Sequence, residues 1–489
     1  MKNVKSVNLK KEVLLELNNN KIHILGEDAH IRKMREHFKY RNPNAFHMRK
    51  AMPRGWDGYM RHISEAGYMP TGLFPRLIAY LEENKFEYEV EDNRKIPEFK
   101  GIPDDISGVT ARDYQDSGVR NLVNNWVGGV YFPRGIIDAA PNAGKTLMMM
   151  AIHMSYSKAK TLILLKDSTL FDQFVKDMPK TFGPTQWGCI RGKTIKWGNI
   201  TVAMAQTLTN YTQKFKKELE AIDILLIDEC DQSNNKTIKR IVETAYNATI
   251  RVGLSGTVFK RNLAKDKPKT EFLHAFFGEV LLTIKNKELM DRGISAPVIV
   301  KISIGNRFLP TDMDYDTVYH KHLSASKQRN EKVVERVKYY LDHGIKPILV
   351  ACRLHEQVEL LYTMLRNKYA IDYKIDYAHV DKSNKSQTIE AFREGKLDIL
   401  VASKVVNRGQ NMPLIKAIIN AAGGDGPEVV LQLLGRGSRT HESKSKTYFD
   451  DLYDAGDYLE RHSKHRISYY KAEGFKVIFL DGLKPKRKK

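Results

Sequence analysis

Residues 139–146 read AAPNAGKT, between the β-branched pair Ile136-Ile137 and the helical run Leu147 to Ser155. A strand, a loop and a helix in this order form a phosphate-binding loop, because backbone N–H groups and the positive end of the helix attract phosphate oxygens. Ala139 stands where the usual pattern has its first glycine, which makes the bare pattern less specific. The alternative is a chance Gly-Lys-Thr at a helix start, and the strand-loop-helix context favours the phosphate loop.

The residue types of this loop assign its roles. Lys145 would reach the β and γ phosphates, and the Thr146 hydroxyl would ligate Mg²⁺. The residues expected to hold the nucleotide through the loop backbone are Asn142, Ala143 and Gly144. We therefore expect ATP and Mg²⁺ as cofactors.

A second motif follows at a domain-scale interval. The apolar run ILLI at residues 224–227 ends in DECD at residues 228–231. Asp228 would hold the Mg²⁺ shell, and Glu229 would orient or deprotonate the attacking water. A single Asp-Glu pair is often only a solvated acidic turn, but the phosphate loop upstream favours a catalytic role.

The wider pattern alternates short apolar strands with helices, which predicts an α/β fold with parallel sheets. Two such series occur, separated by a less regular segment at about residues 305–326, and a small α+β unit precedes them. In that unit, residues 13–25 predict a hairpin around Asn18-Asn19-Asn20, and Asp28 could cap a helix that runs to Phe38. The strands expected in the two series are 136–137, 161–165, 200–203, 222–227 and 251–254, then 347–351, 373–379, 399–402 and 415–420.

Composition narrows the class of protein. The 489 residues carry a formal charge of +22, which favours a polyanionic partner such as DNA or RNA, although solubility alone could explain it. The three cysteines lack metal-ligand spacing and indicate neither a disulfide framework nor a zinc site. No apolar run predicts a membrane span, and the N-terminus lacks the pattern of a secretory signal, so we expect a cytoplasmic protein. The basic tail at residues 484–489 is either a weak phosphate contact or a solvated end.

The ordered motifs resemble those of superfamily 2 helicases over about residues 110–440. Residues 112–115 are similar to the adenine-recognition element, which implies nucleotide contacts by Arg112 and Gln115. Residues 255–257, Ser-Gly-Thr, are similar to the motif that couples ATP to the nucleic-acid track. Residues 165–173 resemble motif Ia, and residues 205–207 resemble the strand-end motif that follows it. The resemblance implies contacts to the nucleic-acid backbone by Lys166, Ser168, Gln206 and Thr207.

In the second series, residues 432–439 match the pattern Q-x-x-G-R-x-x-R at every fixed position. The resemblance gives catalytic roles to Gln432, Arg436 and Arg439, whose guanidinium groups would stabilise transition-state charge as arginine fingers. Residues 403–411 resemble motif V, with Gly409 contributing to the nucleotide site and Asn411 standing where an aspartate is usual. Arg353 and Ser403 are further candidate nucleic-acid contacts.

Shorter stretches resemble the UvsW family of phage recombination helicases. They are RGWDG at residues 54–58, MPTGL at 69–73, and the Asp-Leu-x-Asp-x-Gly pattern within residues 450–456. This resemblance implies ATP-dependent branch migration, fork regression and unwinding of junctions or R-loops in recombination and replication, in the host cytoplasm if the protein is phage-encoded. The changes of segment pattern along the chain divide it into a small α+β domain at 1–95, expected to bind DNA, and two lobes at 108–300 and 327–489. The resemblance implies that both lobes are RecA-like, that the first binds ATP, and that the second carries a C-terminal extension and the basic tail.

The N-terminal unit has its own composition signal. Between Arg32 and Arg61 nine Lys or Arg residues stand against two acids, with five aromatic residues interleaved. Phosphate contact plus stacking on unpaired bases would use this mixture, with Arg54 and Trp56 as the candidates. The alternative places the aromatic side chains in the domain core; we favour it for Phe38 and Phe46 and leave it open for Trp56.

Two rival functions remain at this point. One is an RNA-remodelling helicase, and the other is a non-enzymatic DNA-binding protein on a motor fold. DEAD-box RNA helicases usually have Ser-Ala-Thr at motif III and begin motif VI with His-Arg. This chain has Ser-Gly-Thr and Gln432 at these places, which favours the DNA-translocating branch of the superfamily.

Overall fold

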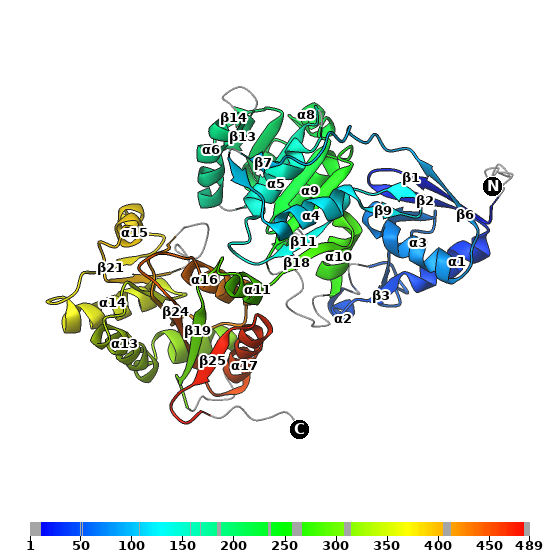
Figure 1. Cartoon of the computed structure of the whole chain (residues 1–489). Coiled ribbons are helices and arrows are strands. Elements are labelled where there is room, and N and C mark those ends of the chain that lie inside the picture. The colour runs from blue at the N-terminus through cyan, green and yellow to red at the C-terminus, as the bar shows by residue number, and fades with distance from the viewer. Residues whose placement is uncertain are drawn as a thin grey trace. The chain divides into compact units, whose positions relative to one another are not determined.

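The computed structural model describes residues 11–48, 50, 52–106, 108–156, 158–166, 168–182, 187–232, 236–256, 267–307, 314–403 and 412–483. The chain forms two compact units (Figure 1). The first is Met1–Ala139 with Gly144–Thr283, and the second is Ala140–Ala143 with Ile284–Lys489. Each unit contains a RecA-like sheet of mainly parallel strands, as the sequence predicts.

The first unit begins with a four-stranded sheet of order β5-β2-β1-β6. Its hairpin is confirmed, because Val13 of β1 pairs with Gly26 of β2 in an antiparallel register and Asn18–Asn20 form the turn. The elements are β1 (Val13–Leu17), β2 (Lys21–Gly26), α1 (Asp28–His37), β3 (Lys39–Arg41), α2 (Ala45–Met48), β4 (Tyr59–Arg61), β5 (Tyr68–Pro70), η2 (Thr71–Leu73), α3 (Phe74–Glu83) and β6 (Tyr88–Asp92).

Two details of this region differ from expectation. Asp28 is the first residue of α1 rather than its cap, and the capping position is Glu27, whose side chain makes no cap hydrogen bond. Phe38 is buried in the core as expected, but Phe46 is 80% exposed. Phe46 lies on the four-residue helix α2, where none of the residues is buried, so no apolar surface covers it.

The second sheet of this unit has eight strands in the order β14-β13-β15-β12-β16-β17-β11-β18. Its five predicted strands are all present and pair in parallel at the centre, where β12, β15, β16 and β17 are buried throughout. The strands are β11 (Arg134–Ala139), β12 (Thr161–Leu165), β13 (Trp187–Arg191), β14 (Thr194–Lys196), β15 (Ile200–Met204), β16 (Ile224–Asp228), β17 (Ile250–Ser255) and β18 (Val280–Ile284). The helices are α4 (Asp113–Val123), α5 (Lys145–Met154), α6 (Ser168–Phe182), α7 (Ala205–Thr209), α8 (Lys216–Glu220), η3 (Cys230–Gln232), α9 (Lys236–Thr244) and α10 (Lys267–Phe277), and two short ribbons pair β7 (Asp105–Ile106) with β8 (Val109–Thr110) and β9 (Trp126–Val127) with β10 (Val130–Tyr131).

The N-terminal sheet is packed onto this lobe. Gly72 lies so close to α10 that a Cβ there would stand 2.3 Å from the carbonyl oxygen of His274. At the hairpin tip, Thr249 donates to Asn19 Oδ1 at 2.9 Å, and buried Arg251 hydrogen-bonds to Asn20. The two sheets therefore share one compact unit, and residues 1–95 do not form a separate one.

The second unit has a seven-stranded parallel sheet of order β21-β22-β20-β23-β24-β19-β25. The strands are β19 (Val298–Ile304), β20 (Ile348–Ala351), β21 (Ile375–Ala378), β22 (Ile399–Ala402), β23 (Ala417–Asn420), β24 (Thr447–Tyr453) and β25 (Lys476–Phe479). The helices are α11 (Asn286–Asp291), α12 (Tyr315–Thr317), η5 (Val318–Ser324), α13 (Lys327–Asp342), α14 (His355–Tyr369), α15 (Lys385–Arg393), α16 (Pro427–Gly437) and α17 (Asp457–Ala472). Pro427 stands in the first turn of α16, where its missing N–H costs no hydrogen bond.

Strand β19 belongs to the sheet of the second unit. We expected the first lobe to extend to residue 300; in the structure β19 pairs in parallel with β24 and β25, and the main segment of the second unit starts at Ile284. An apolar strand such as VIVKISI fits either sheet, and its actual partners lie about 150 and 180 residues further along the chain. Among the described residues, no helix is both long and apolar enough to cross a bilayer.

Candidate active site

The phosphate loop has the local geometry that its sequence predicts. Strand β11 leads into it, and α5 begins at Lys145 after Gly144, whose φ of +81° is left-handed. Glycine is favoured at this position because of the left-handed φ, and a Cβ there would also push against Nε2 of Gln115, which lies 2.1 Å from its place. Lys145 Nζ donates to the carbonyl oxygen of Ala139 at 3.2 Å, so the ammonium group lies over the loop.

Gln115 brings the adenine-recognition element to this loop. It lies in the first turn of α4, where its Oε1 accepts from the backbone N–H of Arg112 at 2.9 Å. The side chain is buried and reaches Gly144, about 30 residues further along the chain. The structure thus places two of the predicted nucleotide-binding segments side by side.

The acidic motif forms a buried cluster at the ends of two neighbouring strands. Asp228 ends β16, Glu229 follows with a left-handed φ of +50°, and Ser255 ends the adjacent β17. Ser255 Oγ lies 3.1 Å from Glu229 Oε2 and 2.9 Å from Asp231 Oδ1. A hydroxyl has one proton to donate, so Ser255 serves one carboxylate at a time. Lys269 Nζ lies 3.4 Å from Asp231.

Burial, then the charge of Asp228, raises the pKa of Glu229 to about 7, against the opposing effect of Lys145. This value is suited to a general base at neutral pH. Three carboxylates in one desolvated cluster also fit a divalent cation, which would lower the cost of their mutual repulsion. Asp228 and the Thr146 hydroxyl, at the start of α5, are the residues that would hold Mg²⁺.

The predicted arginine-finger residues lie in the second unit. Gln432 is half-buried and Arg436 is buried, both on α16, and Arg439 follows the helix in a β-bridge with Ser295. Burial lowers the pKa of Arg439. Gly409 lies outside the described residues.

The other candidates of the second unit lie near strand ends. Ser403 follows β22 and donates its N–H to Ala378 at 3.1 Å. Arg353 follows β20, and its guanidinium group lies 4.2 Å from the ring centre of Tyr319. The three aspartates within residues 450–456 stabilise the fold, because each forms an ion pair with a buried arginine. The pairs are Arg336–Asp450, Arg466–Asp451 and Arg329–Asp454.

In the first unit, the residues predicted to contact the nucleic-acid backbone follow the carboxyl ends of two neighbouring strands. Lys166 and Ser168 follow β12, and Gln206 and Thr207 follow β15, its parallel neighbour. Ser168 and Gln206 are exposed, whereas Thr207 Oγ1 accepts from the N–H of Gly192 at 3.1 Å. These strand ends therefore offer exposed polar groups to a ligand.

Trp56 is half-buried and lies outside the hydrophobic core of its region, and Arg54 is exposed. The indole Nε1 of Trp56 donates to the carbonyl oxygen of Tyr59 at 2.7 Å, which fixes the ring. A ring that is held yet partly exposed suits stacking better than core packing.

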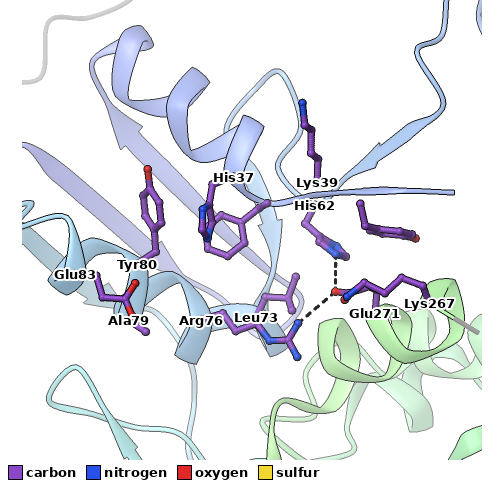
Figure 2. A pocket seen from close by; sticks show the side chains of 12 residues that line it. His37, Lys39, His62, Leu73, Arg76, Ala79, Tyr80, Glu83, Lys267 and Glu271 are labelled. Carbon is purple, nitrogen blue, oxygen red and sulfur yellow. Dashed lines mark hydrogen bonds and ion pairs between the residues drawn. The ribbon is translucent and has the colours of Figure 1, made fainter. Parts of the chain in front are cut away.

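A cavity of about 350 Å³ lies where the N-terminal region meets α10 (Figure 2). Glu271 of α10 is close to His62 at 3.0 Å and Arg76 at 3.3 Å, and it pairs with Lys267 at 2.5 Å. Burial alone would raise the pKa of Glu271, but the hydrogen bonds from His62 and Lys267 outweigh it and lower the pKa to about 2. No sequence motif indicated this network, because its members lie about 200 residues apart.

Comparisons with known proteins match both lobes. The family model of the type III restriction enzyme res subunit matches residues 108–260, and the helicase conserved C-terminal domain matches residues 328–441. The ATP-dependent DNA helicase uvsW of Enterobacteria phage T4 is 21% identical over 469 residues, covering 86% of this chain and 90% of the relative.

Two solved structures share the fold. The ATP-dependent type ISP restriction-modification enzyme LlaBIII bound to DNA has a TM-score of 0.55 at 14% identity, over 84% of this chain and 34% of that one. Saccharomyces cerevisiae Dbp5 bound to RNA and ADP BeF3 has a TM-score of 0.52 at 15% identity, over 76% of this chain and 90% of that one. One of these structures is bound to DNA and the other to RNA, so the shared fold does not show which nucleic acid this chain binds.

Proposed function

The chain belongs to the superfamily 2 helicases, and from this premise we propose that it is an ATP-driven motor that remodels branched DNA. The T4 relative is named as a DNA helicase, which supports DNA as the partner. The observation that carries the branched-DNA part is the packing of the basic N-terminal region onto the ATP-binding lobe. Substrate contacts there and the proposed general base Glu229 would then belong to one compact unit.

In this proposal each residue of the site has a definite task. Lys145 and the loop backbone bind the phosphates, and Gln115 reads the adenine edge. Glu229 accepts a proton from the attacking water, which requires its ionised form. Arg436 and Arg439 of the second unit stabilise the charge that develops on the transferred phosphoryl group. When bound, Mg²⁺ neutralises phosphate charge.

The test is the stimulation of ATP hydrolysis by nucleic acids of matched sequence. Single-stranded DNA, duplex DNA and a four-way junction are compared with single-stranded and duplex RNA. We expect DNA to stimulate turnover and the junction to be unwound. Stimulation by RNA alone would replace the proposal with an RNA-remodelling helicase, and nucleic-acid binding without turnover would indicate a non-enzymatic binding protein.

Arg439→Ala should lower the turnover number by roughly 100-fold, because a finger acts on transition-state charge. The Michaelis constant for ATP should change much less. Steady-state ATPase assays at saturating DNA measure both constants, and Arg461→Ala, on α17 of the same unit, is the control. A variant with weaker ATP affinity and unchanged turnover would exclude the finger role.

Trp56→Ala should reduce junction unwinding by about 10-fold or more, given ~1 to 3 kcal/mol for a stacked base. ATP turnover on single-stranded DNA should stay near wild type. The matched control is Trp126→Ala, since Trp126 is 64% exposed and belongs to no predicted site. A melting temperature that falls steeply in Trp56→Ala alone would instead assign Trp56 to the core.

A further inference from the structure

A cluster of two histidines and one aspartate lies in the second unit, apart from the motif residues assigned above. His355 begins α14, and His379 and Asp381 follow β21. One potential ligand atom from each of the three lies within 4.8 Å of the others. Asp381 Oδ2 is 2.7 Å from His355 Nδ1 and 3.8 Å from His379 Nδ1. The carboxylate therefore faces both imidazole rings.

A fourth residue orients the buried member of this cluster. Glu359, one turn after His355 on α14, has its Oε1 3.3 Å from Nε2 of His379. The Nδ1 atom of His379 accepts the backbone N–H of Asp381 at 3.3 Å. This pattern puts the ring proton on Nε2, and the Nδ1 lone pair, which accepts the N–H of Asp381 over a long 3.3 Å, would exchange that hydrogen bond for the cation. A carboxylate that holds the far nitrogen of a histidine is the usual support of a metal-binding imidazole.

Burial gives the cluster one closed side and one open side. The side chain of His379 is 8% exposed, whereas those of His355 and Asp381 are 41% and 71% exposed. A cation could enter from solvent and keep a water ligand at its open position. Two imidazole nitrogens and one carboxylate suit zinc and its neighbours in the first transition row, whereas Mg²⁺ prefers oxygen ligands.

We propose that His355, His379 and Asp381 bind one divalent transition-metal ion of the zinc type. Zinc bonds of about 2.0 to 2.2 Å require ligand atoms roughly 3.3 to 3.5 Å apart, so small rotations would widen the 2.7 Å contact between Asp381 and His355 and shorten the 3.8 Å separation between Asp381 and His379. The ion would join the start of α14 to the loop after β21, across the intervening strand β22. By holding His355, the ion would also fix the main chain two residues after Arg353, a candidate nucleic-acid contact. This site is separate from the ATP site, whose carboxylates lie in the other unit.

Metal titration of the tag-free, full-length protein tests the proposal directly. Chelator-treated protein is titrated with Co²⁺ and followed by visible absorption, and Zn²⁺ is then added as a competitor. We expect one equivalent of bound Co²⁺ with the absorption of a four- or five-coordinate site, displaced by Zn²⁺ and retained in excess Mg²⁺. Zn²⁺ should also raise the melting temperature of the wild type.

Variants separate this site from weak binding by other histidines. Asp381→Asn and His379→Ala should lose the absorption and the thermal shift, and Glu359→Gln should weaken binding by roughly 10- to 100-fold. His343→Ala, an exposed histidine outside the cluster, should behave as the wild type. If His379→Ala does not fold, the largely exposed Asp381 still gives the answer. Binding that is absent from the wild type, or equal in Asp381→Asn and the wild type, would overturn the proposal.

Discussion

Glu229→Gln lowers the turnover of ATP by roughly 100- to 10,000-fold, the contribution typical of a general base, and leaves ATP affinity within a few-fold of the wild type. The amide keeps the shape of the side chain and can still accept from Ser255 Oγ, but it cannot take a proton from water. Single-turnover hydrolysis and nucleotide binding, measured on the same preparation, give the two constants. The matched control is Glu243→Gln, an exposed glutamate of α9.

Glu229→Gln should also differ from the wild type in how kcat/KM and the melting temperature depend on pH. Because Glu229 has a pKa near 7, the base is lost as the pH falls below 7, so wild-type kcat/KM should fall there while the residual rate of Glu229→Gln stays flat. The folded-state pKa is raised above the ordinary value of 4.5, so ionisation of Glu229 destabilises the fold increasingly as the pH rises from about 4.5 to about 7. Glu229→Gln should therefore melt above the wild type at pH 8, and the difference should shrink towards pH 5. Equal melting curves at pH 8 would contradict the buried charge.

Lys145→Ala lowers ATP turnover by roughly 1000-fold and spares nucleic-acid affinity. Its ammonium group lies over the phosphate loop, and no other described residue of that loop carries a positive charge. ATPase assays measure the loss, and fluorescence anisotropy with labelled DNA measures the affinity. Lys160→Ala, an exposed lysine of the same unit, is the control. Turnover near wild type in Lys145→Ala would reject the phosphate-loop assignment.

The parts of the site that the sequence predicts are those built from neighbouring residues. A phosphate loop needs a strand, a glycine and a helix start within about ten residues, and the acidic motif needs one buried strand. Both are present as predicted. The buried position of Gln115 against Gly144 agrees with its expected nucleotide role without testing it.

The missed features depend on pairing between distant residues. The place of β19 is decided by hydrogen bonds to β24 and β25, and the interaction of Glu271 with His62 joins residues 209 positions apart. Hydrophobic periodicity carries no information about such partners. Phe46 was expected in the core because it is aromatic. It is exposed instead, because it lies on the short helix α2, none of whose residues is buried.

Helix α10 has a mechanical consequence for the motor. Glu271 on this helix is held by His62 and Arg76 of the N-terminal region, and Lys269, two residues earlier, pairs with Asp231 of the acidic cluster. If the N-terminal region binds the substrate as proposed, a displacement of that region would act on α10 at Glu271, and α10 contacts the acidic cluster through Lys269 in its first turn. Load on the substrate and the proposed site of hydrolysis would then be linked through two residues of one helix.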